Sequence, residues 1–390
     1  MALPDWEQEA REVLDACLAR RDEQTRLTTL GAGGYDLEAG RRYLAAVVET
    51  GLAVPRWPAV FGGRDAGAEE VAAITRAHQD FAVPDLYPFR VGLHMVGPTL
   101  LEHGTDAQRE QWLRPMADGS AIWCQLFSEP DAGSDLANVS TIARRDGDEW
   151  LLDGQKVWTS RGAYADWGIC LARHDPEAPK HAGLTMFAVR MDGPGVDVRP
   201  LRQMNGDTHF SEVFLSGARV TDEARIGDVG AGWAVTTTLL AHERAAADRS
   251  APRSVDGSGL PVWLAQLAAS GRLAGPALRD RAMALFAYEE TIRWTQLRAK
   301  ATGAAGSGLK LHGAISFKRR AELMLDADGP QGMLDDAPGA VEFLTGPSMS
   351  IRGGTDEIQR NVVGERVLGL PTEPRVDRGI PWSVSRRGIR

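Results

Sequence analysis

The stretch WCQLFSEPDAGSDLANVSTIARRDGDEWLLDGQKVWTSRG, residues 123–162, decides the fold of this chain. Its first third is predicted to be a loop, because Ser, Glu, Pro, Asp and Gly crowd between an apolar run and a strand. The remainder alternates like a β-hairpin: residues 139–145 and 149–159 form strands, Asp146-Gly147-Asp148 turns, and Asp153-Gly154 is a second break. A strand pair beside a loop rich in backbone N–H groups suits a flat ligand with polar edges, although an ordinary β-sandwich corner has the same local pattern.

The period of two continues beyond this stretch. Short runs separated by Gly, Pro and Asp predict further strands at residues 167–173, 184–191, 196–201 and 211–215. Several short strands in succession favour a small β-barrel or β-sandwich. We therefore expect a middle β-domain over residues 123–232.

Helical patterns flank the expected β-domain. Residues 1–122 are predicted to form an N-terminal α-helical domain, and residues 233–390 a C-terminal four-helix bundle with a short tail. The predicted fold class is therefore α+β and multidomain. Segments expected to be helical include 41–50, 69–81, 91–103, 107–116, 233–247, 276–302, 309–326, 337–344 and 355–367.

Composition excludes several classes of partner. Charged residues make up 25% of the chain, hydrophobic ones 43%, and the formal net charge is −9, which argues against nucleic acid or an anionic membrane. The N-terminus lacks the pattern of a signal peptide, and no run approaches the roughly 20 apolar residues of a membrane span. Cys17, Cys124 and Cys170 show no metal-ligand spacing, so we expect no metal and a cytoplasmic location.

Two long motifs in this order carry a family resemblance. Residues 123–162 resemble the flavin-binding signature of the acyl-CoA dehydrogenase family, roughly C-x-T/S-E-P-x-A-G-S-D followed by G-x-K-x-W-I/T-T/S. Residues 351–371, IRGGTDEIQRNVVGERVLGLP, resemble the family's C-terminal signature. Two such motifs about two hundred residues apart are more specific than either alone. The resemblance covers nearly the whole chain and implies an FAD-dependent oxidoreductase of fatty acid and lipid metabolism.

The resemblance also implies the reaction. The family dehydrogenates an acyl-CoA thioester: a carboxylate removes the α proton, and the β hydrogen leaves as hydride to flavin N5. In many members that carboxylate precedes the Gly-Thr of the C-terminal signature, but here that position is Gly353. Other members place a Glu-Arg pair on the first helix after the β-domain, which corresponds here to Glu243 and Arg244. We therefore expect Glu243 to be the base.

Glu243 has a competing interpretation. Leu239, Leu240, Ala246 and Ala247 lie three or four residues from it on a helix, an apolar setting that favours a basic carboxylate. A lone Glu on a helix, however, more often only pairs with an arginine. The absence of a carboxylate at position 353 favours the catalytic interpretation.

Gly353 and Arg244 have expected roles as well. The backbone N–H at Gly353 is expected to help hold the thioester carbonyl, and the missing side chain to leave room for a bulky, branched or sterol-side-chain acyl group of bacterial lipid catabolism. Arg244 is expected to form a structural or CoA-facing ion pair.

The resemblance assigns flavin contacts position by position. Trp158 is expected to pack on the isoalloxazine ring and Ser160 to lie near N5. The alternative for each hydroxyl is an ordinary turn or strand-edge hydrogen bond. The other matched positions are Phe127 and Ser128 at the isoalloxazine edge, Gly133 and Ser134 at the pyrophosphate or substrate, and Thr355 and Glu357 on the adenine side.

The chain departs from the family where the FAD adenylate binds. No Arg-x-x-Phe-Gly occurs over residues 251–281, and residues 326–332, DADGPQG, match the family's Gln-x-x-Gly-Gly poorly. Arg298 and Lys310 are the available cations for the phosphates. Either FAD binding is rearranged, or a partner chain completes it.

Three functional interpretations follow. The first is an acyl-CoA dehydrogenase that passes electrons to an electron-transfer flavoprotein or a similar acceptor, as a homo-oligomer (dimer or tetramer) or a hetero-oligomer with a related subunit. The second is a flavin monooxygenase or oxidase on the same fold. The third is a non-catalytic or half-site subunit of a hetero-oligomeric acyl-CoA dehydrogenase. The fold is common to all three and does not separate them.

Overall fold

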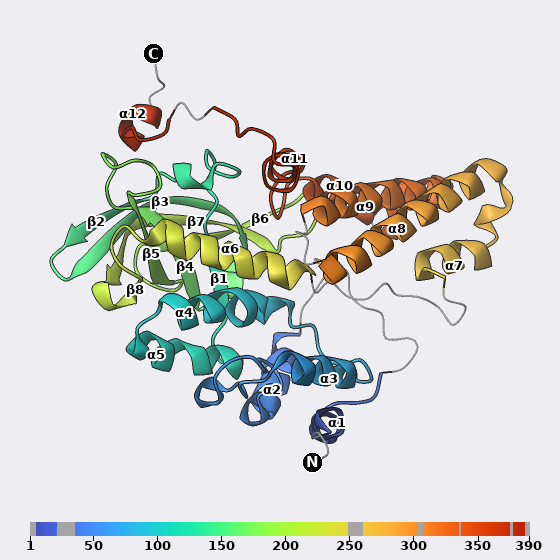
Figure 1. Ribbon diagram of the computed structural model, residues 1–390, viewed down its shortest axis with the longest axis horizontal. Coiled ribbons are helices and arrows are strands. Elements are labelled where there is room, and N and C mark those ends of the chain that lie inside the picture. Colours follow the sequence, from blue (N-terminus) through green and yellow to red (C-terminus); the bar gives the residue numbers. More distant parts are fainter. Residues whose placement is uncertain are drawn as a thin grey trace. The chain divides into compact units, whose positions relative to one another are not determined.

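The computed structural model describes residues 5–21, 36–248, 260–302, 307–334, 337–374 and 377–386. The chain forms two compact units (Figure 1). Unit 1 comprises residues 1–202, 207–243 and 377–390, and unit 2 comprises residues 203–206 and 244–376. The predicted order of helices, strands and then helices is confirmed. Within the described ranges, every helix is too short or too polar to cross a lipid bilayer.

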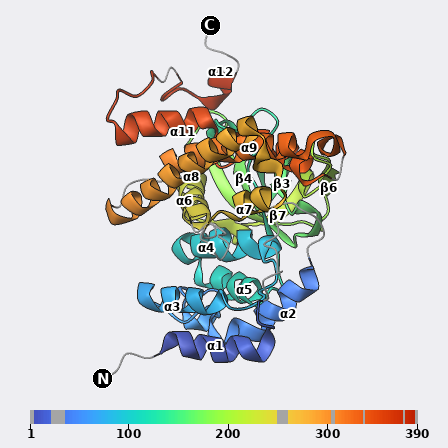
Figure 2. The same ribbon diagram turned by 90° about the vertical axis from the view of Figure 1, so that its right-hand side faces the viewer.

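The N-terminal part of unit 1 is helical. Its helices are α1 (Trp6–Cys17), α2 (Leu37–Val47), α3 (Ala68–His78), α4 (Gly97–His103) and α5 (Asp106–Ala117). Asp5, Asp36 and Thr105 cap α1, α2 and α5 by accepting a hydrogen bond from the backbone N–H three residues onward. Figure 2 shows these helices in layers on one side of the β-sheet, with α4 next to the sheet.

One expected helix is divided. The pattern over residues 91–103 predicts a single helix, but a π-helical turn at Gly92–Val96 precedes α4, and the Gly97 N–H bonds to the Gly92 carbonyl. Pro98, which has no N–H, interrupts the regular ladder at this point. A Cβ at Gly97 would lie 2.0 Å from the Trp57 ring, so glycine permits this close packing.

The middle of unit 1 consists of strands, as the alternating pattern predicts, and in the described residues these strands form an eight-stranded sheet. Along the sheet the strands follow the order β6-β7-β3-β2-β4-β5-β8, and β1 pairs with β4 in parallel. The strands are β1 (Trp123–Leu126), β2 (Ile142–Asp146), β3 (Glu149–Ser160), β4 (Trp167–Arg173), β5 (Leu184–Arg190), β6 (Val196–Leu201), β7 (Phe210–Thr221) and β8 (Arg225–Ile226).

The predicted hairpin is β2–β3, but the second break expected in it is wrong. β3 continues through Asp153 and Gly154 with only a register shift after Leu152. Gly154 serves a close approach instead of a turn, because a Cβ there would lie 2.4 Å from the Thr141 hydroxyl oxygen.

Both faces of the sheet are buried. On β4, Ile169 and Leu171 join the core shared with the N-terminal helices, while Cys170 and Ala172 join a second core on the opposite face. This explains why residues 167–172 of β4 include no charged residue and do not alternate. The helix α6 (Gly232–Asp248) contributes Val235 and Leu239 to the first of these cores. Through Glu243, α6 therefore belongs with the sheet in unit 1.

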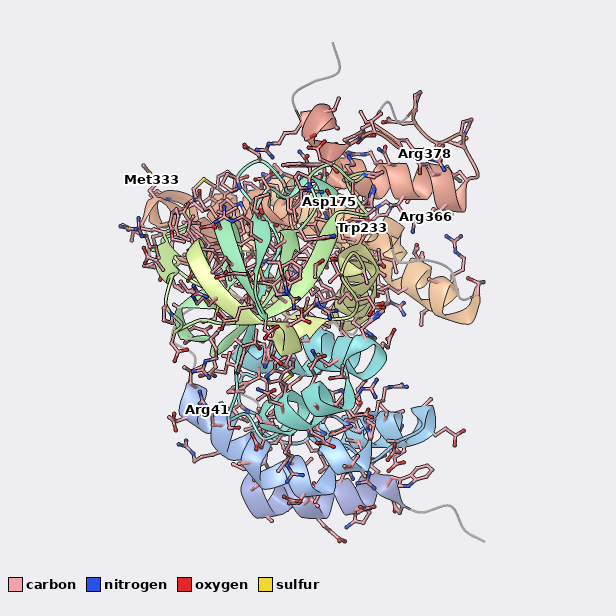
Figure 3. The ribbon with its side chains drawn as sticks, turned by 90° about the vertical axis from the view of Figure 1, so that its left-hand side faces the viewer. Arg41, Asp175, Trp233, Met333, Arg366 and Arg378 are labelled. Atoms are coloured by element: carbon pink, nitrogen blue, oxygen red, sulfur yellow. The ribbon has the colours of Figure 1, made fainter. Side chains whose placement is uncertain are left out.

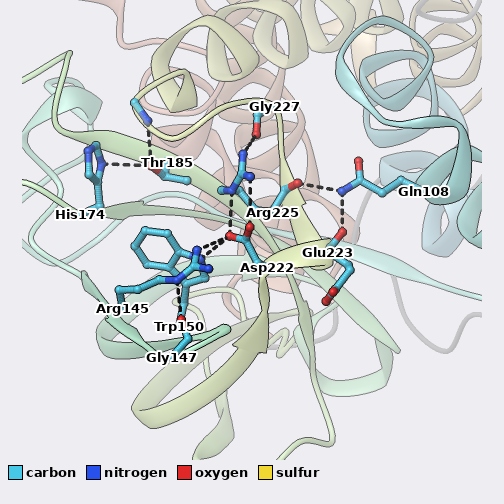
Figure 4. A network of polar contacts seen from close by, with 11 residues as sticks. Gln108, Arg145, Gly147, Trp150, His174, Thr185, Asp222, Glu223, Arg225 and Gly227 are labelled. Atoms are coloured by element: carbon cyan, nitrogen blue, oxygen red, sulfur yellow. Dashed lines mark hydrogen bonds and ion pairs between the residues drawn. The ribbon is translucent and has the colours of Figure 1, made fainter.

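A polar network joins the sheet to the helices of unit 1 (Figure 4). The Asp222 carboxylate accepts hydrogen bonds from Arg225 Nε at 3.0 Å and Trp150 Nε1 at 2.8 Å, and these bonds hold its pKa well below the ordinary value. The side-chain amide of Gln108, on α5, donates to the carbonyls of Glu223 and Arg225 at 2.6 and 2.7 Å. These bonds fix α5 to the end of the sheet.

Unit 2 is helical. Its second helix, α8 (Pro276–Thr302), begins at Pro276, as predicted. The helix α9 (Ser307–Asp328) packs against α8, α10 (Pro338–Met349) and α11 (Asp356–Val362). The helix expected over 355–367 is α11 followed by a π-helical turn at Val363–Val367. The helices are α7 (Val262–Ala269), α8 (Pro276–Thr302), α9 (Ser307–Asp328), α10 (Pro338–Met349) and α11 (Asp356–Val362). The boundaries 1–122, 123–232 and 233–390 stay predictions.

Candidate flavin and substrate site

A buried ion pair joins the loop and the strand expected to hold the flavin. Lys156 of β3 is fully buried, and its ammonium donates to Glu129 Oε1 at 2.9 Å. The same ammonium donates to the carbonyls of Phe127 and Leu171 at 3.2 and 2.7 Å. All three of its protons therefore have acceptors. Because an unpaired buried charge is costly, these bonds tie the loop to the strand.

Glu129 is an anchor of this loop. Its Oε2 accepts from the Ser140 N–H at 2.6 Å and the Ser140 hydroxyl at 2.8 Å, and its Oε1 accepts from the Thr141 N–H at 2.9 Å. Burial alone would raise the pKa of Glu129, but the Lys156 ammonium and these hydrogen bonds outweigh burial and lower the pKa to about 2. Glu129 is therefore ionised at neutral pH and holds the two ends of the loop together.

The residues expected to contact the isoalloxazine ring are neighbours. The Val157 N–H donates to the Ser128 carbonyl at 2.9 Å, which places Ser128 beside the strand end that carries Trp158 and Ser160. The Phe127 side chain lies in the hydrophobic core, so only its backbone is available to a ligand. The structure thus groups all four positions, and their roles toward the flavin stay predictions.

Trp158 has an unusual conformation. Its φ is +59°, in the left-handed region, and it lies where the β3–β7 register shifts between Lys156 and Thr159. Its side chain is 56% exposed and packs edge-to-face with the Phe210 ring, at 5.7 Å between centroids. Such a backbone costs on the order of 1–3 kcal/mol in a residue other than glycine and is found most often at functional sites. An exposed indole held in this way presents an aromatic face to a ligand.

Arg161, three residues later, repeats this conformation. Its φ is +68°, its side chain is buried, and its guanidinium lies 3.7 Å from the centre of the Tyr87 ring. Its N–H donates to the His209 carbonyl at 3.0 Å, which returns the chain to β7. The exposed Trp158 is therefore held between two fixed residues, Lys156 and Arg161.

Gly133 and Ser134 lie on the exposed part of the loop. A Cβ at Gly133 would meet nothing within 4 Å, so the backbone there is open to a ligand. The exposed carboxylates of Asp131 and Asp135 flank the two residues in sequence. An anion bound at this loop therefore has acidic neighbours.

Glu243 lies near the end of α6 in unit 1. It is half-buried and follows, by one helical turn, Leu239, which is fully buried in the core. Arg244 is exposed, and His242 bonds to Glu102 Oε1 of α4 at 2.8 Å. The side chains of Ala246 and Ala247, expected on the same apolar face, lie outside the described ones. The apolar setting is thus seen on the N-terminal side of Glu243.

In unit 2, Gly353 lies in a turn that suits glycine. Gly353 and Gly354 have φ values of +66° and +83°, and the Gly353 carbonyl accepts from Gln359 Nε2 at 2.9 Å. A Cβ at Gly353 would meet nothing within 4 Å. The left-handed backbone, and not a lack of space, therefore disfavours a carboxylate-bearing residue at this position.

Thr355, Glu357 and Lys310 are engaged within unit 2. The Thr355 hydroxyl caps α11 by accepting from the Ile358 N–H at 3.2 Å. The exposed Glu357 carboxylate lies 3.6 Å from the guanidinium of Arg360. Lys310, considered above as a phosphate cation, donates to the buried Asp356 at 3.2 Å. Arg298 is exposed on α8.

Comparison with known protein families assigns nearly all of the chain. Residues 6–120 match the family model "Acyl-CoA dehydrogenase, N-terminal domain", residues 124–217 the middle domain, and residues 268–368 the C-terminal domain. The chain therefore belongs to the acyl-CoA dehydrogenase family.

Two relatives from mycobacteria illustrate the similarity. The chain is 39% identical over 338 residues to acyl-CoA dehydrogenase FadE34 of Mycobacterium tuberculosis, which covers 84% of this chain. The chain spans only 46% of that relative's length. It is 34% identical over 368 residues to acyl-CoA dehydrogenase IpdE1 of Mycolicibacterium smegmatis, covering 89% of this chain and 93% of the relative.

Solved structures agree with this assignment. A "Tcur3481-Tcur3483 steroid ACAD" is similar with a TM-score of 0.74 at 28% identity, over 94% of this chain and 97% of that one. The ChsE4-ChsE5 complex from Mycobacterium tuberculosis is similar with a TM-score of 0.70 at 25% identity, over 96% of this chain and 99% of that one.

The chain is thus an acyl-CoA dehydrogenase, a flavoprotein oxidoreductase of lipid metabolism with FAD as its cofactor. The described residues fit a flavin at one place in unit 1. Trp158 presents an exposed indole on a left-handed backbone, Ser160 follows two residues later, and the loop that carries the open Gly133 begins at Ser128, which bonds to Val157.

Sequence reasoning missed the residues that hold this site. Glu129 and Lys156 both stand inside the first quoted motif, residues 123–162, yet their pairing became visible only in the structure. The strand β3 also carries Glu149, Asp153 and Gln155, so its sequence does not single out Lys156 as a buried charge that needs a partner. The left-handed backbone at Trp158 and Arg161 left no sequence signal either.

Proposed function

We propose that this chain dehydrogenates the Cα–Cβ bond of a bulky acyl-CoA thioester, with Glu243 as the base that removes the α proton. The observation that carries the proposal is a glutamate one turn beyond the buried Leu239 on α6, in a chain whose other candidate position is Gly353. FAD, when bound, supplies the acceptor for the hydride that leaves Cβ.

Glu243 suits this role because its helix shields it from water on one side. Val235, Thr236 and Leu239, which precede it on the same face of α6, are fully buried. A carbon acid α to a thioester is weak, so its base works best where solvent is excluded and the carboxylate is poorly hydrated. Arg244 is exposed and available to the phosphates of CoA.

Gly353 contributes a backbone donor. Its N–H is proposed to bind the thioester oxygen, where negative charge develops as the α proton leaves. Any residue supplies an N–H, but glycine adopts the left-handed backbone at this turn without strain and adds no side chain. The empty side-chain position supports a bulky or branched acyl group.

The proposed flavin contacts are those that the family signatures assign. Trp158 packs on the ring, Ser160 lies near N5, and the backbones of Phe127 and Ser128 line its edge. Gly133 and Ser134 take the pyrophosphate or the substrate, and Thr355 and Glu357 the adenine side.

The substrate is proposed to be the thioester of a bulky or branched acyl group such as a steroid side chain. One similar structure, Tcur3481-Tcur3483, is a steroid ACAD, and the chain matches it along almost its whole length. The empty position at Gly353 agrees with so large an acyl group. A cytoplasmic location and an electron-transfer flavoprotein as acceptor complete the proposal.

A second candidate function is one half of a paired enzyme. The chain spans 46% of FadE34, and two similar structures are described by pairs of names, Tcur3481-Tcur3483 and ChsE4-ChsE5. The missing adenylate motifs point the same way, because a related subunit can supply the contacts that this chain lacks. We therefore favour a hetero-oligomer over a homodimer or homotetramer.

The test is a flavin spectrum of the protein purified alone and after co-expression with a related chain from the same genome. The proposal predicts bound FAD that is bleached anaerobically by steroid side-chain thioesters and much less by straight-chain ones. A flavin that straight-chain thioesters bleach as fast would contradict the substrate class. Rapid reoxidation by oxygen would support the monooxygenase or oxidase alternative.

A further inference from the structure

The C-terminal segment 377–386, here called the C-terminal strap, folds back onto the β-domain of unit 1. Its helix α12 (Trp382–Arg386) follows a β-bridge between Pro381 and Pro179. The Trp382 N–H donates to the Ala178 carbonyl at 3.0 Å, and the next N–H donates to the Pro176 carbonyl at 2.9 Å. Pro176, Ala178 and Pro179 belong to the loop between β4 and β5. Figure 3, which labels Asp175 of this loop and Arg378 of the strap, shows both at the same edge of the domain.

Trp382 is the centre of the contact. Its side chain is only 7% exposed, and its Nε1 donates to Asn138 Oδ1 at 2.8 Å. The guanidinium of the fully buried Arg173 lies 4.3 Å from the centre of the indole ring. Arg173 in turn donates to the carbonyls of Val139 and Ala137 at 3.1 and 2.7 Å. The indole therefore covers an arginine whose hydrogen bonds fix the end of the loop expected to bind the flavin.

Two ion pairs reach the exposed part of the same loop. Arg386 donates to Asp131 at 3.2 Å. Lys180 donates to both oxygens of Asp135 at 3.0 Å, and Asp377 of the strap pairs with the same ammonium. The strap thus meets the loop at residues 131, 135 and 138, directly or through Lys180. Gly133 and Ser134 lie between these points.

We propose that the C-terminal strap is a positioning element for FAD: it sets the backbone of loop 131–138 and engages the two carboxylates that flank Gly133 and Ser134. This inference rests on the proposed role of Gly133 and Ser134. Unpaired, Asp131 and Asp135 repel an anion at the loop, and paired with Arg386 and Lys180 they do so less. Arg173 holds the loop only while the Trp382 ring keeps water from its guanidinium.

The first experiment measures the loop itself. Hydrogen–deuterium exchange of the backbone amides in 131–138 is compared between wild type and Trp382→Ala in the full chain without FAD. The proposal predicts faster exchange in this loop and unchanged exchange in α9 of unit 2. Trp382→Phe keeps a ring over Arg173 and is expected to restore most of the protection. Trp294→Ala, at an exposed tryptophan of α8, is the matched control.

The second experiment measures FAD affinity by quenching of flavin fluorescence, with the partner chain present where FAD binding requires it. Arg386→Gln removes one ion pair from the surface without opening the core and is expected to weaken FAD binding about fivefold, the effect of about one unit charge at contact distance in water. Trp382→Ala is expected to weaken it further.

The outcomes separate the strap from the proposed function. Loop exchange as slow as in wild type, in a folded Trp382→Ala protein, refutes the strap. Wild-type FAD affinity in both Arg386→Gln and Trp382→Ala refutes it as well. If wild type binds no FAD even with its partner, the proposed function fails, and loop exchange alone still decides whether the strap positions the loop. If Trp382→Ala does not fold, Arg386→Gln decides both points: the proposal predicts faster exchange near Asp131 and weaker FAD binding, and wild-type values in both measurements refute the strap.

Discussion

The buried pair Glu129–Lys156 gives the sharpest stability prediction. Glu129→Gln removes the negative charge but leaves the Lys156 ammonium inside the protein, with carbonyl acceptors and no counter-ion. Removing one partner of a buried ion pair costs about 3–5 kcal/mol of the free energy of unfolding. The lowered pKa of Glu129 leads to a similar free energy. A pKa lowered from 4.5 to about 2 corresponds to about 3 kcal/mol at neutral pH.

The assay is urea unfolding, followed by tryptophan fluorescence, of wild type and three variants. Glu129→Gln is expected to lose about 3–5 kcal/mol, and Glu129→Gln combined with Lys156→Met to recover part of that loss, because no buried charge then remains. Arg219→Met, which breaks an exposed pair with Glu149, is the control and should lose less than about 1 kcal/mol. A loss no larger than that of the control in Glu129→Gln refutes the anchoring role.

The same pair predicts a pH dependence. The folded pKa of Glu129 is lowered, so its contribution is complete above its ordinary pKa of 4.5 and is lost as pH falls toward about 2. The difference in unfolding free energy between wild type and Glu129→Gln should therefore shrink over that acid range. A difference that stays constant from neutral pH to pH values near 2 contradicts the linkage.

Two further predictions concern backbone conformation. Trp158→Gly relieves a left-handed φ and loses a largely exposed ring, so we expect the free energy of unfolding to be unchanged or raised by about 1 kcal/mol. We also expect at least about tenfold weaker flavin binding in a fluorescence titration. A Trp158→Gly variant that binds flavin normally refutes the ring contact. Gly353→Ala has open space but a φ of +66°, so we expect it to destabilise unit 2 by about 1–2 kcal/mol in urea unfolding. Gly313→Ala, with equal space inside α9, is its control and should be neutral or stabilising; equal effects in the two variants contradict the strain.

Much of the fold is predictable because local patterns dominate it. Pro276 starts α8, as a proline at a helix N-terminus indicates. Gly51, with a φ of +70°, follows the 3₁₀ turn after α2, where a glycine marks the helix end. The β2–β3 hairpin follows from alternation and the Asp-Gly-Asp turn. Asp153-Gly154 misled the prediction, because a glycine that admits a neighbouring Thr141 looks, in sequence, like a glycine that turns the chain.

The parts of the site that sequence did not predict depend on contacts between distant residues. Lys156 meets Glu129, and Trp382 meets Asn138 across most of the chain's length. Neither partner carries a local pattern that names the other. The left-handed Trp158 is likewise imposed by the register shift between β3 and β7, a property of the pair of strands.

The central claim is that Glu243 removes the α proton, and anaerobic stopped-flow bleaching of the flavin by a steroid side-chain thioester tests it most directly. Glu243→Gln should retain FAD and thioester binding but bleach about 10²–10⁴-fold more slowly. Glu102→Gln, which changes a carboxylate that pairs with the neighbouring His242, should bleach at the wild-type rate. A wild-type rate in Glu243→Gln contradicts the account and leaves the base elsewhere, on this chain or on a partner subunit.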